Sequence, residues 1–209
     1  MEKAQKAADA LKARYRPLSD DHKDILFQEA RSQNGWLDEP VTDAQLHELY
    51  ALTKMGATSM NSCPARFVFL RSNDEKERLK PALAEPNIAK TMSAPVVAII
   101  GYDSAFHKHM GKLFPHRDVK PMFEHNEALR EATAFRNGTL QGAYLIMAAR
   151  AIGLDCGPMS GFNNSAVDEI FFKDTTVKSN FLCCLGQGDS TKPFQRLPRF
   201  EFSEVCQIK

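Results

Sequence analysis

The residues best suited to chemistry lie in four polar turns, each placed at the end of an apolar element. These turns cover residues 31–34, 57–64, 157–162 and 196–199, and most are rich in hydroxyl, amide or guanidinium groups. Arginine beside hydroxyl groups suits a phosphate, whereas amide groups and glycines suit the edge and face of a flat heterocycle. Each turn alone is typical of ordinary capping, but their order and spacing favour a binding function.

Several other catalytic sites are poorly supported. The sequence contains no GxSxG, GxxxxGK[ST] or HExxH pattern, which argues against a serine hydrolase, a P-loop enzyme and a zincin. Residues 186–188 complete no GxGxxG and predict a turn at the end of a strand. The polar stretch around residues 107–109 favours a solvated mobile loop over a metal site, and Cys63 is interpreted as a buried structural thiol. We therefore predict no bound metal.

Composition points to one near-neutral domain over residues 1–209. The 27 basic and 26 acidic side chains leave a formal net charge of +1, which argues against a protein that binds nucleic-acid backbones. Five cysteines without CxxC spacing favour a reducing compartment. The N-terminus has no apolar signal core, and the apolar run 94–100 is too short to cross a bilayer. We expect a cytoplasmic protein.

The turns must be positioned by a small sheet and a long helix. Apolar residues at helical spacing, with polar caps before them and Gly or Pro after them, predict four helices. Short runs of aromatic and β-branched residues predict three strands, the second of them buried on both faces. The predicted helices cover 4–15, 19–30, 42–56 and 140–152, and the predicted strands cover 66–70, 95–100 and 181–185. Together they indicate an α+β or α/β domain.

Three longer segments resemble conserved stretches of a known family. Residues 30–36 are similar to a first flavin-binding turn, residues 58–67 to a Pro-Ser-Ser-x-Asn-x-Gln-Pro-Trp stretch, and residues 148–154 to the end of a central helix. These likenesses mark the nitroreductase-like flavoproteins, from about residue 20 to the end. Within that family, five short segments resemble the malonic semialdehyde reductases: 34–37, 58–61, 134–137, 157–162 and 178–182.

The resemblance implies an α+β fold in which a central mixed or antiparallel sheet is flanked by helices. It also implies two intertwined protomers with FMN held at the interface of this homodimer. In such a site Arg31, together with Arg199 or Arg196, would hold the phosphate, and Ser32 would contact the ribityl chain or the phosphate.

The same resemblance places other residues around the flavin ring. Ser59 and Asn61 would contact the ring edge, and a backbone N–H of Ser160 or Gly161 would face flavin N5. Asn34 stands near the pyrimidine edge, where many family members have a basic residue. A neutral side chain there would stabilise the anionic reduced flavin less.

The implied activity is hydride transfer from NADH or NADPH through FMN to a small aldehyde. Malonic semialdehyde, reduced to 3-hydroxypropionate, is the leading acceptor. The alternatives are a broad nitro-compound or quinone reductase and a flavin-binding protein without turnover, with a metal-dependent hydrolase far behind. No dinucleotide-binding domain is present to indicate a preference between NADH and NADPH.

An acceptor that carries a carboxylate needs a cation in its site. The sequence offers five candidates: Arg66, His107, His109, Arg117 and Arg136. The polar stretch 103–126 has two open interpretations. It is either a lid over the flavin or a surface excursion that packs on the partner subunit.

Overall fold

The computed structural model describes residues 2–209, which separate into two units, residues 2–30 and Arg31–Lys209. The first unit contains α1 (Glu2–Lys12), α2 (Asp20–Lys23) and the π-helical turn η1 (Asp24–Gln28). Ser19 caps α2, because its hydroxyl accepts from the backbone N–H of His22 at 3.4 Å. The two predicted N-terminal helices are therefore confirmed, although both are shorter than predicted.

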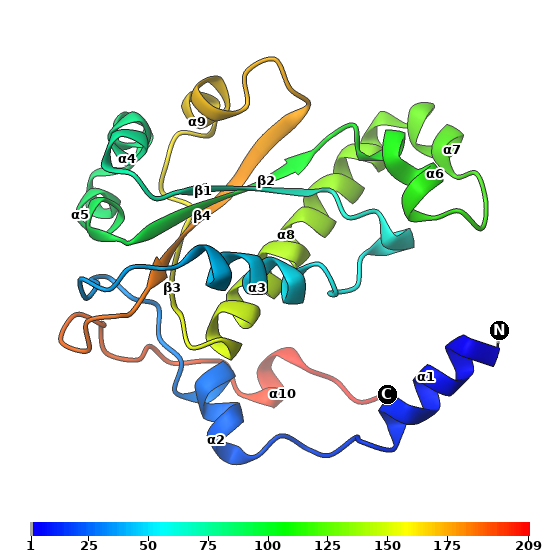
Figure 1. Cartoon of the computed structure of the whole chain (residues 1–209), viewed down its shortest axis with the longest axis horizontal. Coiled ribbons are helices and arrows are strands. Elements are labelled where there is room, and N and C mark those ends of the chain that lie inside the picture. The colour runs from blue at the N-terminus through cyan, green and yellow to red at the C-terminus, as the bar shows by residue number, and fades with distance from the viewer. Residues whose placement is uncertain (1) are drawn as a thin grey trace. The chain divides into compact units, whose positions relative to one another are not determined.

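A four-stranded antiparallel sheet forms the centre of the second unit (Figure 1). The strands are β1 (Ala65–Leu70), β2 (Val96–Asp103), β3 (Asp155–Met159) and β4 (Val177–Gly186), in the order β1-β2-β4-β3. The three predicted strands are present, and β3 is the one that was missed. Its Gly157-Pro158 pair predicts a turn, but β3 is an edge strand, where a proline is tolerated.

Helices cover both faces of the sheet. On one side lie α3 (Asp43–Thr53) and α8 (Glu127–Ala151), and on the other lie α4 (Asn73–Leu79), η3 (Lys80–Ala82), α5 (Glu85–Ser93) and α9 (Asn164–Phe171) (Figure 1). Successive side chains of β2 point to opposite faces and pack in the two different cores. Ala98 packs among the side chains of α3 and α8, and Ile99 packs among those of α4 and α9. The predicted burial of this strand on both faces is confirmed.

Residues 103–126 contribute to a third core, and the interpretation of residues 107–109 as a solvated loop was wrong, because they lie in a 3-10 helix with His107 buried. The stretch contains η4 (Phe106–His109), α6 (Met110–Leu113) and α7 (Lys120–Glu124). Phe106 and Phe123 are buried edge-to-face at 4.9 Å and pack on Ala134 of α8. The many charged residues between these apolar positions hid the pattern in the sequence.

The central helix α8 begins well before the predicted residue 140. The side chain of Asn126 caps it by accepting from the backbone N–H of Leu129 at 2.9 Å. At its other end the predicted stop is confirmed, since Gly153 adopts a left-handed φ of +78°. The 3-10 turn η2 (Ser59–Asn61) and the short α10 (Phe202–Val205) complete the second unit. No helix within residues 2–209 is long and apolar enough to cross a membrane.

Two glycines allow α8 to lie directly on the sheet, and one of them provides a test. A Cβ atom at Gly142 would lie 2.5 Å from the ring of Phe181 and 3.2 Å from Ile100. We expect Gly142→Ala to cost about 1–3 kcal/mol through overpacking, which outweighs the ~1 kcal/mol that alanine gains over glycine in a helix. The urea midpoint of the protein should therefore fall.

The matched control is Gly111→Ala in α6, where no atom lies within 4 Å of the new methyl group. Its urea midpoint should stay unchanged or rise slightly. Equal midpoints for the two variants would contradict the close packing of α8.

Candidate functional site

The turn between α3 and β1 is strained and is held in place by α8. Met60, Asn61 and Cys63 have φ values of 50°, 52° and 40°, which cost about 1–2 kcal/mol per residue for side chains other than glycine. The side-chain oxygen of Asn137 accepts from the backbone N–H of Ser59 at 2.8 Å, and that of Gln141 accepts from Ala65 at 2.8 Å. The two buried amides, one turn apart on α8, thus fix the turn at both ends.

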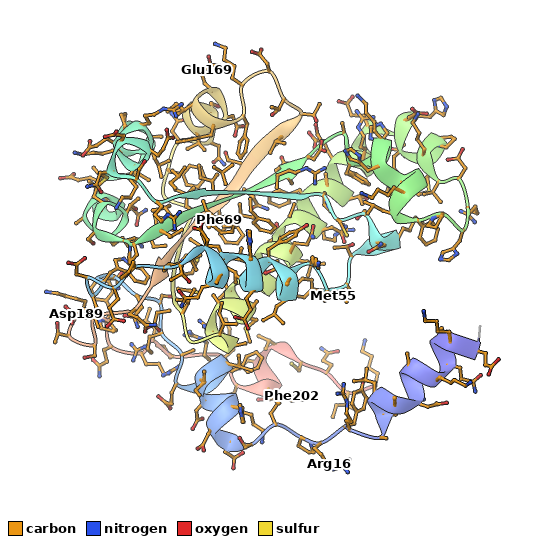
Figure 2. All side chains as sticks on the ribbon, in the orientation of Figure 1. Arg16, Met55, Phe69, Glu169, Asp189 and Phe202 are labelled. Carbon is orange, nitrogen blue, oxygen red and sulfur yellow. The ribbon has the colours of Figure 1, made fainter. Side chains whose placement is uncertain are left out.

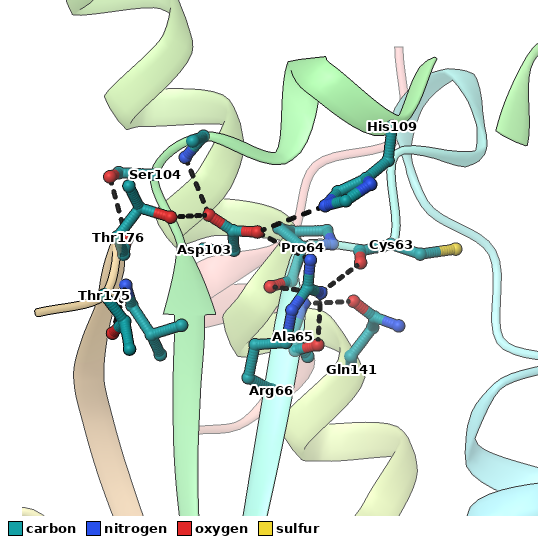
Figure 3. Close-up of polar contacts among 12 residues, drawn as sticks. Cys63, Pro64, Ala65, Arg66, Asp103, Ser104, His109, Gln141, Thr175 and Thr176 are labelled. Carbon is teal, nitrogen blue, oxygen red and sulfur yellow. Dashed lines mark hydrogen bonds and ion pairs between the residues drawn. The ribbon is translucent and has the colours of Figure 1, made fainter. Parts of the chain in front are cut away.

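Asp103, at the end of β2, ties this turn to the rest of the fold (Figure 3). Its carboxylate accepts from the Arg66 guanidinium at 2.6 Å, and its other oxygen accepts from the hydroxyl of Thr176 at 2.6 Å and the backbone N–H of Ala105 at 2.8 Å. His109 Nε2 lies 3.8 Å from the same carboxylate. Asp103 therefore joins β1, β2, η4 and the segment that leads into β4.

Arg66 is occupied by these structural contacts. Besides the bond to Asp103, its guanidinium donates to the carbonyl groups of Cys63, Pro64 and Ala65 at 2.9–3.3 Å (Figure 3). The strained backbone of the turn is thus hydrogen-bonded to the Arg66 guanidinium, whose charge is balanced by Asp103.

A cavity of about 760 Å³ opens beside the turn. Three of the predicted site residues line it, namely Asn61, Arg66 and His109. Asn61 also donates from Nδ2 to the carbonyl of Leu113 at 2.8 Å, which draws α6 over the turn. The excursion 103–126 therefore supplies one wall of the cavity.

A second group of predicted residues lies along β3. The backbone N–H of Gln33 donates to the carbonyl of Cys156 at 2.9 Å, so residues 31–34 run beside this strand. The Arg31 guanidinium donates to the carbonyl of Phe194. Arg31 is thereby brought to the C-terminal segment that carries Arg196 and Arg199. In that segment Arg199 donates to the carbonyls of Leu197 and Pro198, each at 3.0 Å.

Ser160 and Gly161 follow β3 directly. The carbonyl of Gly161 accepts from the backbone N–H of Ala84 at 3.0 Å and from Asn87 Nδ2 at 2.9 Å. The backbone N–H groups of Ser160 and Gly161 donate to no group of residues 2–209. Both donors are therefore available to a ligand.

Asn87 belongs to this group, and the sequence analysis missed it. Its residue type and position predict nothing by themselves, because a polar residue in the first turn of α5, just after Pro86, is ordinary. Only the tertiary contact with Gly161 places it at the site.

The two groups stand at opposite edges of the sheet. Ser59 and Asn61 precede β1, whereas Ser160 and Gly161 follow β3, and β2 and β4 lie between them. Neighbouring strands are about 4.8 Å apart, so the edges are separated by about 14 Å. They also differ in face, since α8 holds the first group and α5 the second. Within one chain the two groups therefore lie at different edges and on different faces of the sheet.

Three of the proposed carboxylate-binding residues lie away from the cavity. Arg117 and Arg136 are exposed and do not line it. His107 is buried, and its Nδ1 has no hydrogen-bond partner within residues 2–209. Burial and the nearby charge of Arg130 lower the pKa of His107. This histidine is thus suited to the interior of the third core.

The prediction of a buried thiol at Cys63 was wrong. Cys63 is half-buried and lines the cavity, where its Sγ lies 3.4 Å from the side-chain oxygen of Asn61. The buried thiols are those of Cys156, Cys183 and Cys184. Burial raises the pKa of Cys184 to about 12, which keeps that thiol protonated and unreactive.

Comparison with known proteins gives consistent matches along the chain. A family model described as Nitroreductase family matches residues 28–187. A protein of Burkholderia lata named as an NADH dehydrogenase/NAD(P)H nitroreductase is 57% identical over 192 residues, covering 92% of this chain and 98% of that protein. HadB of Ralstonia pickettii, which bears the same name, is 59% identical over 186 residues, covering 88% of this chain and 95% of HadB.

A solved structure of a nitroreductase from Exiguobacterium sibiricum in complex with FMN has the same fold. The two structures agree with a TM-score of 0.79 at 17% identity, covering 93% of this chain and 100% of that one. Likeness at this level of identity concerns the fold alone.

The contacts of Asp103 predict a large effect of its removal. Its side chain is only 8% exposed, and Asp103→Ala would leave Arg66 without its carboxylate partner and the Thr176 hydroxyl without its acceptor. We expect a loss of about 3 kcal/mol in the free energy of unfolding. Asp103→Asn, which keeps one oxygen acceptor, should cost about 1–2 kcal/mol.

Asp43→Ala is the matched control, because Asp43 pairs with Arg71 at 2.7 Å on the surface. This exposed pair should contribute less than about 1 kcal/mol. If urea unfolding gave the same loss for Asp103→Ala as for Asp43→Ala, Asp103 would not hold the turn.

Proposed function

The chain belongs to the nitroreductase family, and we propose that it is an FMN-dependent oxidoreductase that uses NAD(P)H to reduce a small organic acceptor. When bound, FMN supplies the hydride chemistry between the two substrates. The residues of the chain bind and orient the reactants and exclude water.

The available backbone donors of Ser160 and Gly161 carry this proposal. Two adjacent N–H groups that have no acceptor within residues 2–209 fit a ring nitrogen of a flavin, and the Gly161 carbonyl beside them is held by Ala84 and Asn87. A second sign lies next to Ser32, where the buried side-chain oxygen of Gln33 has no hydrogen-bond partner within residues 2–209. Arg31 offers a cation for the phosphate close to the segment that carries Arg196.

We propose that the flavin site is completed by a second copy of the chain. The support is topological, because the groups at β1 and β3 lie on opposite edges of one sheet. The C-terminal segment also exposes large apolar side chains, among them Phe202 (Figure 2). A partner surface would cover these residues: Phe194, Leu197, Phe200, Phe202, Val205 and Ile208.

For the acceptor we propose a small aldehyde with a carboxylate, malonic semialdehyde, which gains a hydride and a proton to become 3-hydroxypropionate. The cationic lining of the cavity beside Asn61 supports an anionic acceptor. A nitro compound is the second candidate, favoured by the names of the relatives from Burkholderia lata and Ralstonia pickettii.

A mixed dimer tests where the two groups meet. Arg31→Ala removes the cation that is proposed to bind the FMN phosphate. Asn61→Gly removes the side-chain amide proposed to contact the ring edge, and glycine adopts the left-handed backbone of this position without strain. Either homodimer should lose bound FMN. A heterodimer of the two variants, isolated through two different tags, should recover about half of the parent's flavin absorbance, because symmetry leaves one of its two sites intact.

If both groups served the same site within one chain, each site of the heterodimer would contain one damaged group. Such a protein would bind no more FMN than the homodimers do. That result, or a parent protein that runs as a monomer, would contradict the shared site.

The absorption spectrum and the choice of acceptor test the activity. The FMN-loaded parent should bleach with NADH or NADPH in the absence of oxygen and regain its colour with an acceptor. Turnover of malonic semialdehyde and of a nitroaromatic at equal enzyme concentration separates the two candidates. Bound flavin that neither nicotinamide bleaches would identify a flavin-binding protein without turnover.

A further inference from the structure

We propose that Lys54 and Lys112 form an anion-binding subsite that makes the enzyme prefer acceptors with a carboxylate. This inference rests on the proposed function and concerns the cavity beside the turn 58–64. It assigns the preference to two residues that the sequence did not single out.

The cavity concentrates positive charge in a nearly neutral protein. Lys54, Arg66 and Lys112 line it together with the titratable His109, and none of the described residues that line it is an aspartate or a glutamate. The whole chain carries a formal net charge of only +1. A potential of one sign in such a hollow raises the local concentration of oppositely charged substrates.

Among the cationic side chains that line the cavity, the two lysines are not engaged by a carboxylate of residues 2–209, whereas Arg66 is. Arg66 is paired with Asp103 at 2.6 Å and also donates to three backbone carbonyls. Lys54 and Lys112 form no ion pair with any carboxylate in residues 2–209. Lys54 Nζ lies over the Tyr50 ring, 5.9 Å from its centroid.

Both lysines flank the turn that is proposed to hold the ring edge. Lys54 directly follows α3 and is joined to Thr58 by residues that also line the cavity. Lys112 precedes Leu113, whose carbonyl accepts from Asn61 at 2.8 Å. An acceptor bound in the cavity at Asn61 would therefore occupy a hollow that both lysines line.

The rest of the wall suits a flat organic body rather than an inorganic anion. Tyr50 and Phe67 meet edge-to-face with ring centroids 6.4 Å apart, and both line the cavity. A carboxylate about 4 Å from one ammonium gains about 1 kcal/mol in water and more where water is displaced. The lining therefore favours a flat organic acceptor that carries a carboxylate.

The test compares 4-nitrobenzoate with 4-nitrobenzamide, two acceptors that share the reducible group and differ in charge. The FMN-loaded parent, Lys54→Gln, Lys112→Gln and the double variant are assayed with both. Each single variant should lower kcat/KM for 4-nitrobenzoate about threefold to tenfold, and the double variant by more. For 4-nitrobenzamide, kcat/KM of each variant should stay within about twofold of the parent's value. The ratio of the two acceptors is compared between variants, so intrinsic differences in their reactivity cancel.

The matched control is Lys80→Gln. Lys80 pairs with Glu77 at 3.1 Å at the junction of α4 and η3, outside the cavity. It should leave the ratio of the two acceptors unchanged. Raising the ionic strength from about 0.01 M to about 0.15 M shortens the Debye length from about 30 Å to about 8 Å, which should reduce the parent's preference but not that of the double variant.

An unchanged acceptor ratio in the double variant, with FMN bound and bleached by NADH as in the parent, overturns the subsite and leaves the proposed function standing. A KM for NADH that rises as much as the KM for 4-nitrobenzoate also overturns it, because the lysines would then serve the dinucleotide. A parent that binds no FMN overturns the proposed function itself.

Discussion

Gly138 and Gly142 remove two side chains from the face of α8 that meets the sheet, and the helix axis consequently lies close to β2 and β4. A Cβ atom at either position would approach a sheet side chain to 2.7 Å or less. This close contact fixes the distance between the helix and the sheet. At that distance the side-chain amides of Asn137 and Gln141, which neighbour the two glycines, reach the backbone of the turn before β1. The geometry of the cavity thus follows from how closely one helix packs.

The strain in that turn is supported by a chain of polar contacts. The turn contains three residues with positive φ. Two amides of α8 and the Arg66 guanidinium bond to its backbone, and Arg66 is in turn paired with Asp103. Asp103 also accepts from Thr176, which lies just before β4. The site is therefore built on three strands and a helix, although its contacting groups lie on loops. Loops positioned by a rigid scaffold are the usual location of binding residues.

The sequence predicts the elements whose local pattern agrees with their burial. β2 and β4 have continuous apolar runs and are buried on both faces, and the second half of α8 has a clear helical stripe. β3 was not predicted because its Gly-Pro pair is typical of a turn. A proline is tolerated in this strand only because the strand lies at the edge of the sheet. The first half of α8 was not predicted because polar residues such as Thr133 and Asn137 occupy buried positions there, so no apolar stripe is visible in the sequence.

The candidate site could be predicted only in part, for a similar reason. Turn residues such as Arg31 and Asn61 were identified by type and by family resemblance. Asn87 and the pair of lysines 54 and 112 became visible only once tertiary contacts and a shared cavity brought them to those turns. For the carboxylate-binding cation, residue types alone do not rank the five candidates. Packing separates them, since His107 lies inside the third core and Arg66 is already paired.

The division of recognition groups between the two edges of the sheet links ligand affinity to protein concentration. Under the proposed arrangement an isolated chain holds only half of each flavin site, so dilution that separates the subunits would also release the cofactor. By the same linkage, free FMN would favour association, with a stabilisation that grows as RT ln(1 + [L]/Kd). The cell's supply of flavin would then set how much of the chain is assembled as well as how much is active.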